Sequence, residues 1–158
     1  DSADTEIYNA AVGEDGPKPD PDPAPHRLLS LEQWHAVRSH WPQHIPVAIE
    51  FPNDADIRQL APDLDRIALV VLDFPKWTDG RAYSQARLLR NRLRFDGTVR
   101  ARGAVLVDMV QLLARTGFDE AVLRGDQSRA AAERLLGHFA AGFYQGDVHE
   151  ARPHFSRA

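Results

Sequence analysis

Residues 67–74 read Ile67-Ala-Leu-Val-Val-Leu-Asp-Phe74 and decide the fold class. The run is continuous, apolar and of strand length, as expected of a strand covered on both faces in a parallel sheet. A polar turn follows, and then a helix whose buried stripe is expected to contain Ala82, Ala86, Leu89 and Leu93. A strand that leads into a helix predicts a βα unit, and open α/β sheets bind ligands at the carboxyl ends of such strands.

The same pattern repeats on both sides of this unit. Strands are predicted at residues 45–51, 67–74, 98–102 and 118–124, and each is followed by a helix. The last of these helices carries an apolar stripe that ends at Phe143, and an earlier helix begins after Ser30, with Gln33 in the capping-box position. The predicted fold is therefore α/β, a parallel sheet of about four βα units. It is either open and doubly wound, or half-barrel-like and able to close on a second copy in a homodimer.

Three segments are predicted along the chain. Residues 1–28 form an extended arm, because proline alternates with small or charged residues from Asp15 to Pro25 and blocks helix and central strand. Residues 29–146 form a single α/β domain. Residues 147–158 have no periodicity and are expected to be a flexible tail.

Composition excludes several classes of protein. The 158 residues carry a net charge of −4, which gives no reason to expect nucleic acid or a membrane surface as partner. No apolar run approaches the roughly 18 residues that span a bilayer, and no signal-peptide pattern opens the chain, so a cytoplasmic location is expected. The absence of cysteine excludes disulfides, thiolate nucleophiles and cysteine-ligated clusters.

Arginine is the most unevenly used residue. Of the 19 basic residues 17 are arginine, and seven of these lie between Arg81 and Arg102. The planar guanidinium suits carboxylate, sulfate or phosphate oxygens. The alternative is that the run forms a solvated helix surface.

The predicted ligand-binding residues are Asp79, Gly80, Arg81, Ser84, Arg100, Arg102 and Asp108. Gly80 would let backbone amides approach an oxyanion, and Arg81 with Ser84 would bind it from the first turn of the helix. The arginines of the neighbouring strand would complete this site. In the alternative, Asp79 only caps the helix and pairs with an arginine nearby.

Asp108 is expected to be buried, because it shares a stripe with Gln111 and Arg115 in the most apolar helix. Such a carboxylate needs a cationic partner, and the candidates are Arg81, Arg100 and Arg102. The resulting network would either tune an acid or base or stabilise the fold. Three aromatic residues are candidates for stacking on a ligand or for core packing: Trp77, Tyr83 and Tyr144.

Several motifs in the same order carry a resemblance to a known family. They are residues 74–84, 86–90 and 100–103, Asp108, residues 115–119, and Tyr144-Gln145. From Leu29 to Gln145 the chain resembles a bacterial family of unknown function, domain of unknown function 934. Its members are often labelled probable oxidoreductases because their genes lie beside those of assimilatory sulfite reductase. The resemblance implies a setting in sulfur assimilation and cysteine biosynthesis, with sulfite reductase or another sulfur-assimilation protein as partner.

The residues do not favour a redox reaction. Electron or hydride transfer needs a cofactor, and no strand is followed by a Gly-rich dinucleotide motif. No cofactor and no metal are therefore predicted. We expect an accessory or interaction protein of assimilatory sulfite reduction without chemistry of its own. The alternative is a small oxyanion-binding enzyme or an oxidoreductase in the same process, and the sequence leaves open whether the protein is an enzyme.

Overall fold

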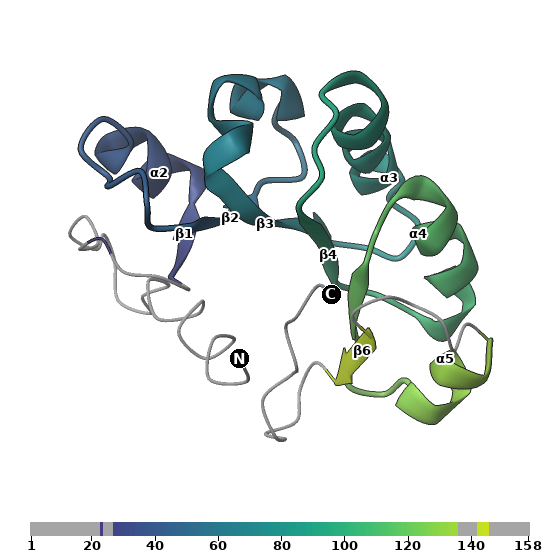
Figure 1. Ribbon diagram of the computed structural model, residues 1–158. Helices are drawn as coiled ribbons and strands as arrows, with labels where there is room; N and C mark the ends of the chain where they lie inside the picture. The colour runs from purple at the N-terminus through teal and green to yellow at the C-terminus, as the bar shows by residue number, and fades with distance from the viewer. Residues whose placement is uncertain (1–22, 24–26, 136–141, 146–158) are drawn as a thin grey trace.

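The computed structural model describes residue 23, residues 27–135 and residues 142–145, with side chains up to Leu135 (Figure 1). Nearly all of the predicted arm and the whole of the predicted tail therefore lie outside the described residues. Leu28, the last residue assigned to the arm, begins the first strand.

Strands and helices alternate along the described chain. The strands are β1 (Leu28–Ser30), β2 (Val47–Phe51), β3 (Ile67–Phe74), β4 (Thr98–Gly103), β5 (Glu120–Leu123) and β6 (Gly142–Gln145). The α-helices are α2 (Leu31–Val37), α3 (Arg81–Arg87), α4 (Val110–Thr116) and α5 (Arg129–Leu135). Shorter helical elements are the 3-10 helices η1 (Ile57–Arg66) and η3 (Val107–Met109) and the π-helical turn η2 (Leu88–Arg92).

The strands form one parallel sheet in the order β1-β2-β3-β4-β5-β6. Because right-handed crossovers that always step in the same direction place every helix on the same face, this order gives a one-sided arrangement. Figure 1 shows the labelled helices along the outer, convex side of the curved sheet. The α/β prediction is confirmed, and of the two sheets the sequence allowed, the half-barrel-like one is observed. A doubly wound sheet would require the strand order to reverse.

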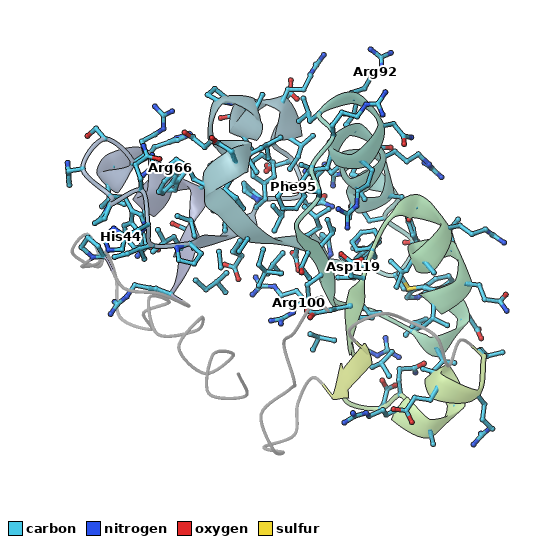
Figure 2. The ribbon with its side chains drawn as sticks, in the orientation of Figure 1. His44, Arg66, Arg92, Phe95, Arg100 and Asp119 are labelled. Atoms are coloured by element: carbon cyan, nitrogen blue, oxygen red, sulfur yellow. The ribbon has the colours of Figure 1, made fainter. Side chains whose placement is uncertain are left out.

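The two faces of the sheet have different side chains. Since successive residues of a strand point to opposite faces, Val70, Leu72 and Phe74 join the core beneath the helices. Leu69 and Val71 belong to a separate buried cluster on the inner face, together with Leu28 and Ala48. Figure 2 shows Arg92 on the helix side of the sheet and Arg100 on the inner side.

Agreement with the sequence prediction is closest at β3, which has the predicted bounds. Ser30 also caps α2 as predicted: its Oγ accepts a hydrogen bond from the backbone N–H of Gln33, and the Gln33 side chain accepts one from the backbone N–H of Ser30. The sequence missed both edge strands, β1 and β6. The prediction that Phe143 ends the apolar stripe of a helix is wrong, because Phe143 lies in β6.

Candidate functional site

In the turn before α3, the oppositely charged side chains of Asp79 and Arg81 are bonded to each other. The Asp79 carboxylate accepts hydrogen bonds from the backbone N–H of Arg81 at 3.0 Å and from its Nη2 at 2.8 Å. The hydrogen bond from the Arg81 side chain is the main cause that lowers the pKa of Asp79 to about 2. Gly80 has an ordinary φ of −92° and open space around it. The turn therefore matches the pairing half of the alternative, with the Arg81 charge already compensated by Asp79. The capping half is wrong, because the N-cap residue of α3 is Gly80 and no side chain caps the helix.

Ser84 and Arg81 line a pocket of about 330 Å³ beside the loop that follows β2. Gln85 forms the floor of this region: it is 5% exposed, and its Nε2 donates to the carbonyls of Pro52 at 2.9 Å and Ala55 at 3.1 Å. These bonds tie α3 to the loop. The bonds stabilise the backbone of the loop, because the side-chain amide of Gln85 donates to main-chain carbonyl oxygens.

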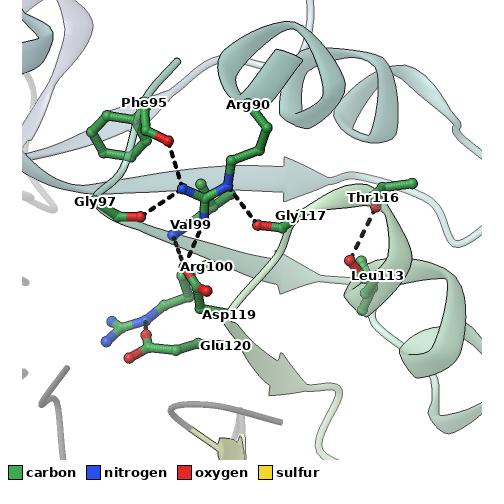
Figure 3. A network of polar contacts seen from close by, with 10 residues as sticks. All are labelled: Arg90, Phe95, Gly97, Val99, Arg100, Leu113, Thr116, Gly117, Asp119 and Glu120. Carbon is green, nitrogen blue, oxygen red and sulfur yellow. Dashed lines mark hydrogen bonds and ion pairs between the residues drawn. The ribbon is translucent and has the colours of Figure 1, made fainter. Parts of the chain in front are cut away.

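The two arginines of β4 lie on the inner face of the sheet, two residues apart. Arg100 and Glu120 form a buried ion pair, with Nε and Oε1 2.6 Å apart and side-chain exposures of 7% and 0% (Figure 3). Arg102 pairs with Glu50 of β2, and its Nε lies 3.8 Å from Oδ1 of Asp73 in β3. Each guanidinium thus faces at least one carboxylate from a neighbouring strand.

The predicted site is consequently divided among separate places. Arg81 and Ser84 lie at one pocket, and Arg102 lies at another. Asp108 is exposed on η3, so the prediction that it is buried is wrong. Gln111 and Arg115, which share its stripe, are exposed as well, so the three residues do lie on one side of the helix, but it is the solvent side. The buried side is formed by Met109, Val110 and Leu113.

A second pocket, of about 510 Å³, opens at the carboxyl ends of β1 to β4. Three carboxylates line it with one guanidinium, because Glu32, Glu50 and Asp73 accompany Arg102. An oxyanion entering here would meet a net negative surface. Sequence reasoning missed Glu50, although a signal existed: it is a charged residue between two buried ones, Ile49 and Phe51, near the end of a strand.

Three arginines on the helix side of the sheet differ from those of β4 in being exposed to solvent. Arg87, Arg92 and Arg94, which we name the arginine face, are exposed at and beyond the end of α3. None of the three forms an ion pair with another residue that the structure describes. Arg90, in the same run, is different: its guanidinium is mostly buried and bonds to the backbone (Figure 3).

Of the three aromatic residues that were candidates for stacking on a ligand, one is buried and one is exposed. Tyr83 is buried, with its ring centroid 5.0 Å from that of Phe74 and 6.3 Å from that of Phe118, and burial raises its pKa. It is therefore a core residue. Trp77 is 55% exposed on the turn after β3. The side chain of Tyr144 lies outside the described residues.

Two negative findings apply to the described part of the chain. No helix there combines the length and apolarity needed to cross a bilayer. Among those same residues, no three His, Asp or Glu side chains are grouped closely enough to hold a metal ion.

The comparisons with known proteins place the chain in a family. A family model described as a bacterial protein of unknown function (DUF934) matches residues 48–155, which is most of the chain. No curated protein matches it. The match covers the sheet from the second residue of β2 onward, including both arginines of β4. The chain therefore belongs to the DUF934 family of bacterial proteins of unknown function.

Proposed function

We propose that this protein is an accessory protein of assimilatory sulfite reduction that binds an acidic surface of a larger partner through the arginine face. The observation that carries the proposal is the contrast between two sets of arginines. Arg100 and Arg102 are neutralised by carboxylates of the chain itself. Arg87, Arg92 and Arg94 are exposed and form no ion pair within the described residues.

Exposed, uncompensated guanidinium groups suit protein recognition. Arginine is enriched in interfaces because its planar fork binds carboxylates in a bidentate manner and is weakly hydrated. Arg87 and Arg92 are five residues apart along α3 and η2, about 8 Å at the helical rise, and Arg94 follows two residues later, so the three fit within one standard interface. Charges of this kind steer association, so binding should weaken as salt rises.

The metabolic setting comes from the resemblance of the sequence to a family encoded beside assimilatory sulfite reductase. We accordingly propose that the partner is sulfite reductase or another sulfur-assimilation protein, and that the complex forms in the cytoplasm. The rival function, a small oxyanion-binding enzyme or oxidoreductase, is less well supported. An anion at Arg81, Arg100 or Arg102 would have to displace a carboxylate that is already hydrogen-bonded or ion-paired there.

The test is a binding measurement with purified assimilatory sulfite reductase. The test variant, Arg87→Gln/Arg92→Gln/Arg94→Gln, removes three positive charges from the arginine face. The control variant, Arg58→Gln/Arg124→Gln/Arg134→Gln, removes three from exposed positions elsewhere. We expect the wild type and the control to bind and the test variant to lose at least about tenfold in affinity. The absorbance spectrum of the purified protein is recorded beforehand, because a bound flavin would support the oxidoreductase alternative.

Two results would count against the proposal. Absence of binding by the wild-type protein at low salt would remove sulfite reductase as the partner. Equal loss in both triple variants would show that only the net charge matters, and the arginine face would have no special role. A circular-dichroism melt of each variant verifies that it is folded.

A further inference from the structure

Trp77 differs from the other tryptophans of the chain. Trp34 is 0% exposed and Trp41 is 3% exposed, whereas Trp77 is 55% exposed. Among the described residues only one other large hydrophobic side chain is exposed, that of Leu135 at the end of α5. Leaving an indole in water forgoes the burial of a large apolar surface, so its position on a turn calls for a physical reason.

The turn that carries Trp77 is braced on both sides. The backbone N–H of Asp79 donates to the carbonyl of Lys76 at 3.0 Å, which closes the turn around Trp77. The hydrogen bonds that Arg81 donates to the Asp79 carboxylate then fix the turn to the start of α3. Pro75 restricts the backbone at the entry. Because the segment is already ordered by these bonds, burying Trp77 in a partner would cost little backbone entropy.

We propose that Trp77 is the anchor residue of this protein, inserting into an apolar pocket on the same acidic protein surface that the arginine face binds. The proposal rests on the proposed function and adds to it the residue that contributes most of the affinity. Tryptophan and arginine are the residues most enriched at such positions. The partner surface would therefore combine carboxylates with one apolar pocket deep enough for an indole.

The spacing permits both contacts at once. From Arg81 to Arg92 the chain runs along the 7 residues of α3 and the 5 of η2, or about 17 Å at the helical rise. A standard interface covers about 800 Å² on each partner, which is wide enough for a tryptophan at one end of this helix and arginines at the other. Arg81, which stands between Trp77 and the arginine face in the sequence, is 62% exposed.

The test compares Trp77→Ala with Leu135→Ala in the binding measurement with purified sulfite reductase. Both variants shorten one exposed apolar side chain, so both are expected to fold with nearly unchanged stability. Trp77→Ala should weaken binding by at least about thirtyfold, as for an interface hot spot. Leu135→Ala should change it by less than about twofold. Trp77→Phe should lie between Trp77→Ala and the wild type, because it keeps part of the apolar surface.

A spectroscopic readout follows Trp77 directly. The protein is prepared with 5-hydroxytryptophan, which can be excited apart from the tryptophans of the partner. Acrylamide should quench mainly Trp77 in the free protein, because Trp34 and Trp41 are buried. Addition of sulfite reductase should protect it from quenching. Unchanged quenching in a complex that has demonstrably formed would overturn the proposal.

The outcomes separate the two proposals. If the triple variant of the arginine face loses binding and Trp77→Ala binds as the wild type does, the anchor is wrong and the proposed function stands. If Trp77→Ala loses binding and the triple variant does not, the interface contains Trp77 but excludes the arginine face. If the wild-type protein does not bind at all, both proposals fall.

Discussion

Nη2 of Arg90 lies 2.6 Å from Oδ2 of Asp119, and this ion pair joins the π-helical turn after α3 to the start of β5. The same carboxylate oxygen accepts a hydrogen bond from the backbone N–H of Val99 in β4 at 3.0 Å. One arginine therefore connects three successive parts of the half-barrel. The segment that ends at Arg90, which carries part of the resemblance to the family, therefore stabilises the fold.

Replacing Arg90 should destabilise the protein strongly. Besides its ion pair, the guanidinium donates to the carbonyls of Phe95, Gly97 and Gly117 at 2.8–2.9 Å. Arg90→Met leaves these acceptors and a carboxylate without their donor, and we expect it to lower the free energy of unfolding by about 3 kcal/mol. Arg92→Met, at an exposed position of the same turn, should cost less than about 0.5 kcal/mol. Urea unfolding of the two variants measures the difference, and equal costs would contradict this role.

A single glycine should be indispensable at the end of β4. Gly103 has a φ of +99°, and a Cβ there would lie 2.5 Å from the carbonyl oxygen of Phe74. Gly103→Ala should therefore cost at least about 2 kcal/mol of unfolding free energy, since the obstructing atom belongs to the backbone. Gly80→Ala is the control: no atom lies within 4 Å of its Cβ position, and we expect a change within about 0.5 kcal/mol. Thermal unfolding that ranks the two variants the other way would refute the prediction.

Asp63 should make stability depend on pH. Burial by itself raises the pKa of Asp63, but hydrogen bonds from Arg38 and from Nε1 of Trp34 outweigh it, and the net pKa is lowered. A carboxylate with a lowered pKa stabilises the fold above its unfolded pKa of about 3.9, and this contribution is lost as the pH falls through the folded value. Asp63→Asn should therefore cost about 2 kcal/mol at pH 7 and progressively less below pH 4.

The measurement for Asp63 is chemical unfolding at pH 3, 5 and 7. Asp65→Asn serves as its control, because Asp65 is exposed in the same 3-10 helix. The prediction does not survive if the difference between wild type and Asp63→Asn is constant with pH.

A glutamate in place of the buried Gln85 should destabilise the protein as the pH rises, whereas the stabilising effect of Asp63 is lost as the pH falls. In Gln85→Glu the donor that bonds to the carbonyls of Pro52 and Ala55 becomes an acceptor when ionised. Burial and these carbonyls should raise the pKa of the new carboxyl, so its cost appears as the pH rises above about 4.3. At pH 7 we expect a loss of about 3 kcal/mol. Gln111→Glu, exposed on α4, should show no such trend in the same unfolding series.

Anions should bind weakly at the positions that the sequence favoured. Sulfite, sulfate or phosphate at about 10 mM should raise the melting temperature by no more than about 1 °C beyond sodium chloride of equal ionic strength. The physical reason is that Arg81, Arg100 and Arg102 are already paired with carboxylates. A larger rise that disappears in Arg81→Ala or Arg102→Ala would instead favour the oxyanion-binding enzyme.

The fold was predictable where local sequence alone determines the structure. The apolar run of β3 and the capping box at Ser30 are short-range signals, and both hold. The edge strand β1 has three residues and leads directly into a helix, which leaves no alternation to detect. At Phe143 the apolar spacing matched a helical stripe, but pairing with β5 holds the segment extended, a tertiary effect that periodicity does not contain.

The candidate site was less predictable because it depends on register. The spacing of Arg100 and Arg102 correctly places both on the same face of a strand. The strand partners that neutralise them, Glu50 and Glu120, lie 52 and 20 residues away along the chain. Sequence spacing cannot tell which residue of a neighbouring strand stands opposite. The sequence therefore showed that arginines are concentrated in this region, but not which carboxylates neutralise them.

The sequential strand order has a consequence for how the chain is made. Each strand pairs with those immediately before and after it in the chain, so no strand has to wait for a distant segment before it can pair. Paired residues lie 20–29 positions apart in the chain, so each crossover closes only a local loop, and the amino-terminal units can assemble while the ribosome is still producing the later ones. The nascent protein can thus grow one βα unit at a time, each new strand using the exposed edge of the previous one as its template.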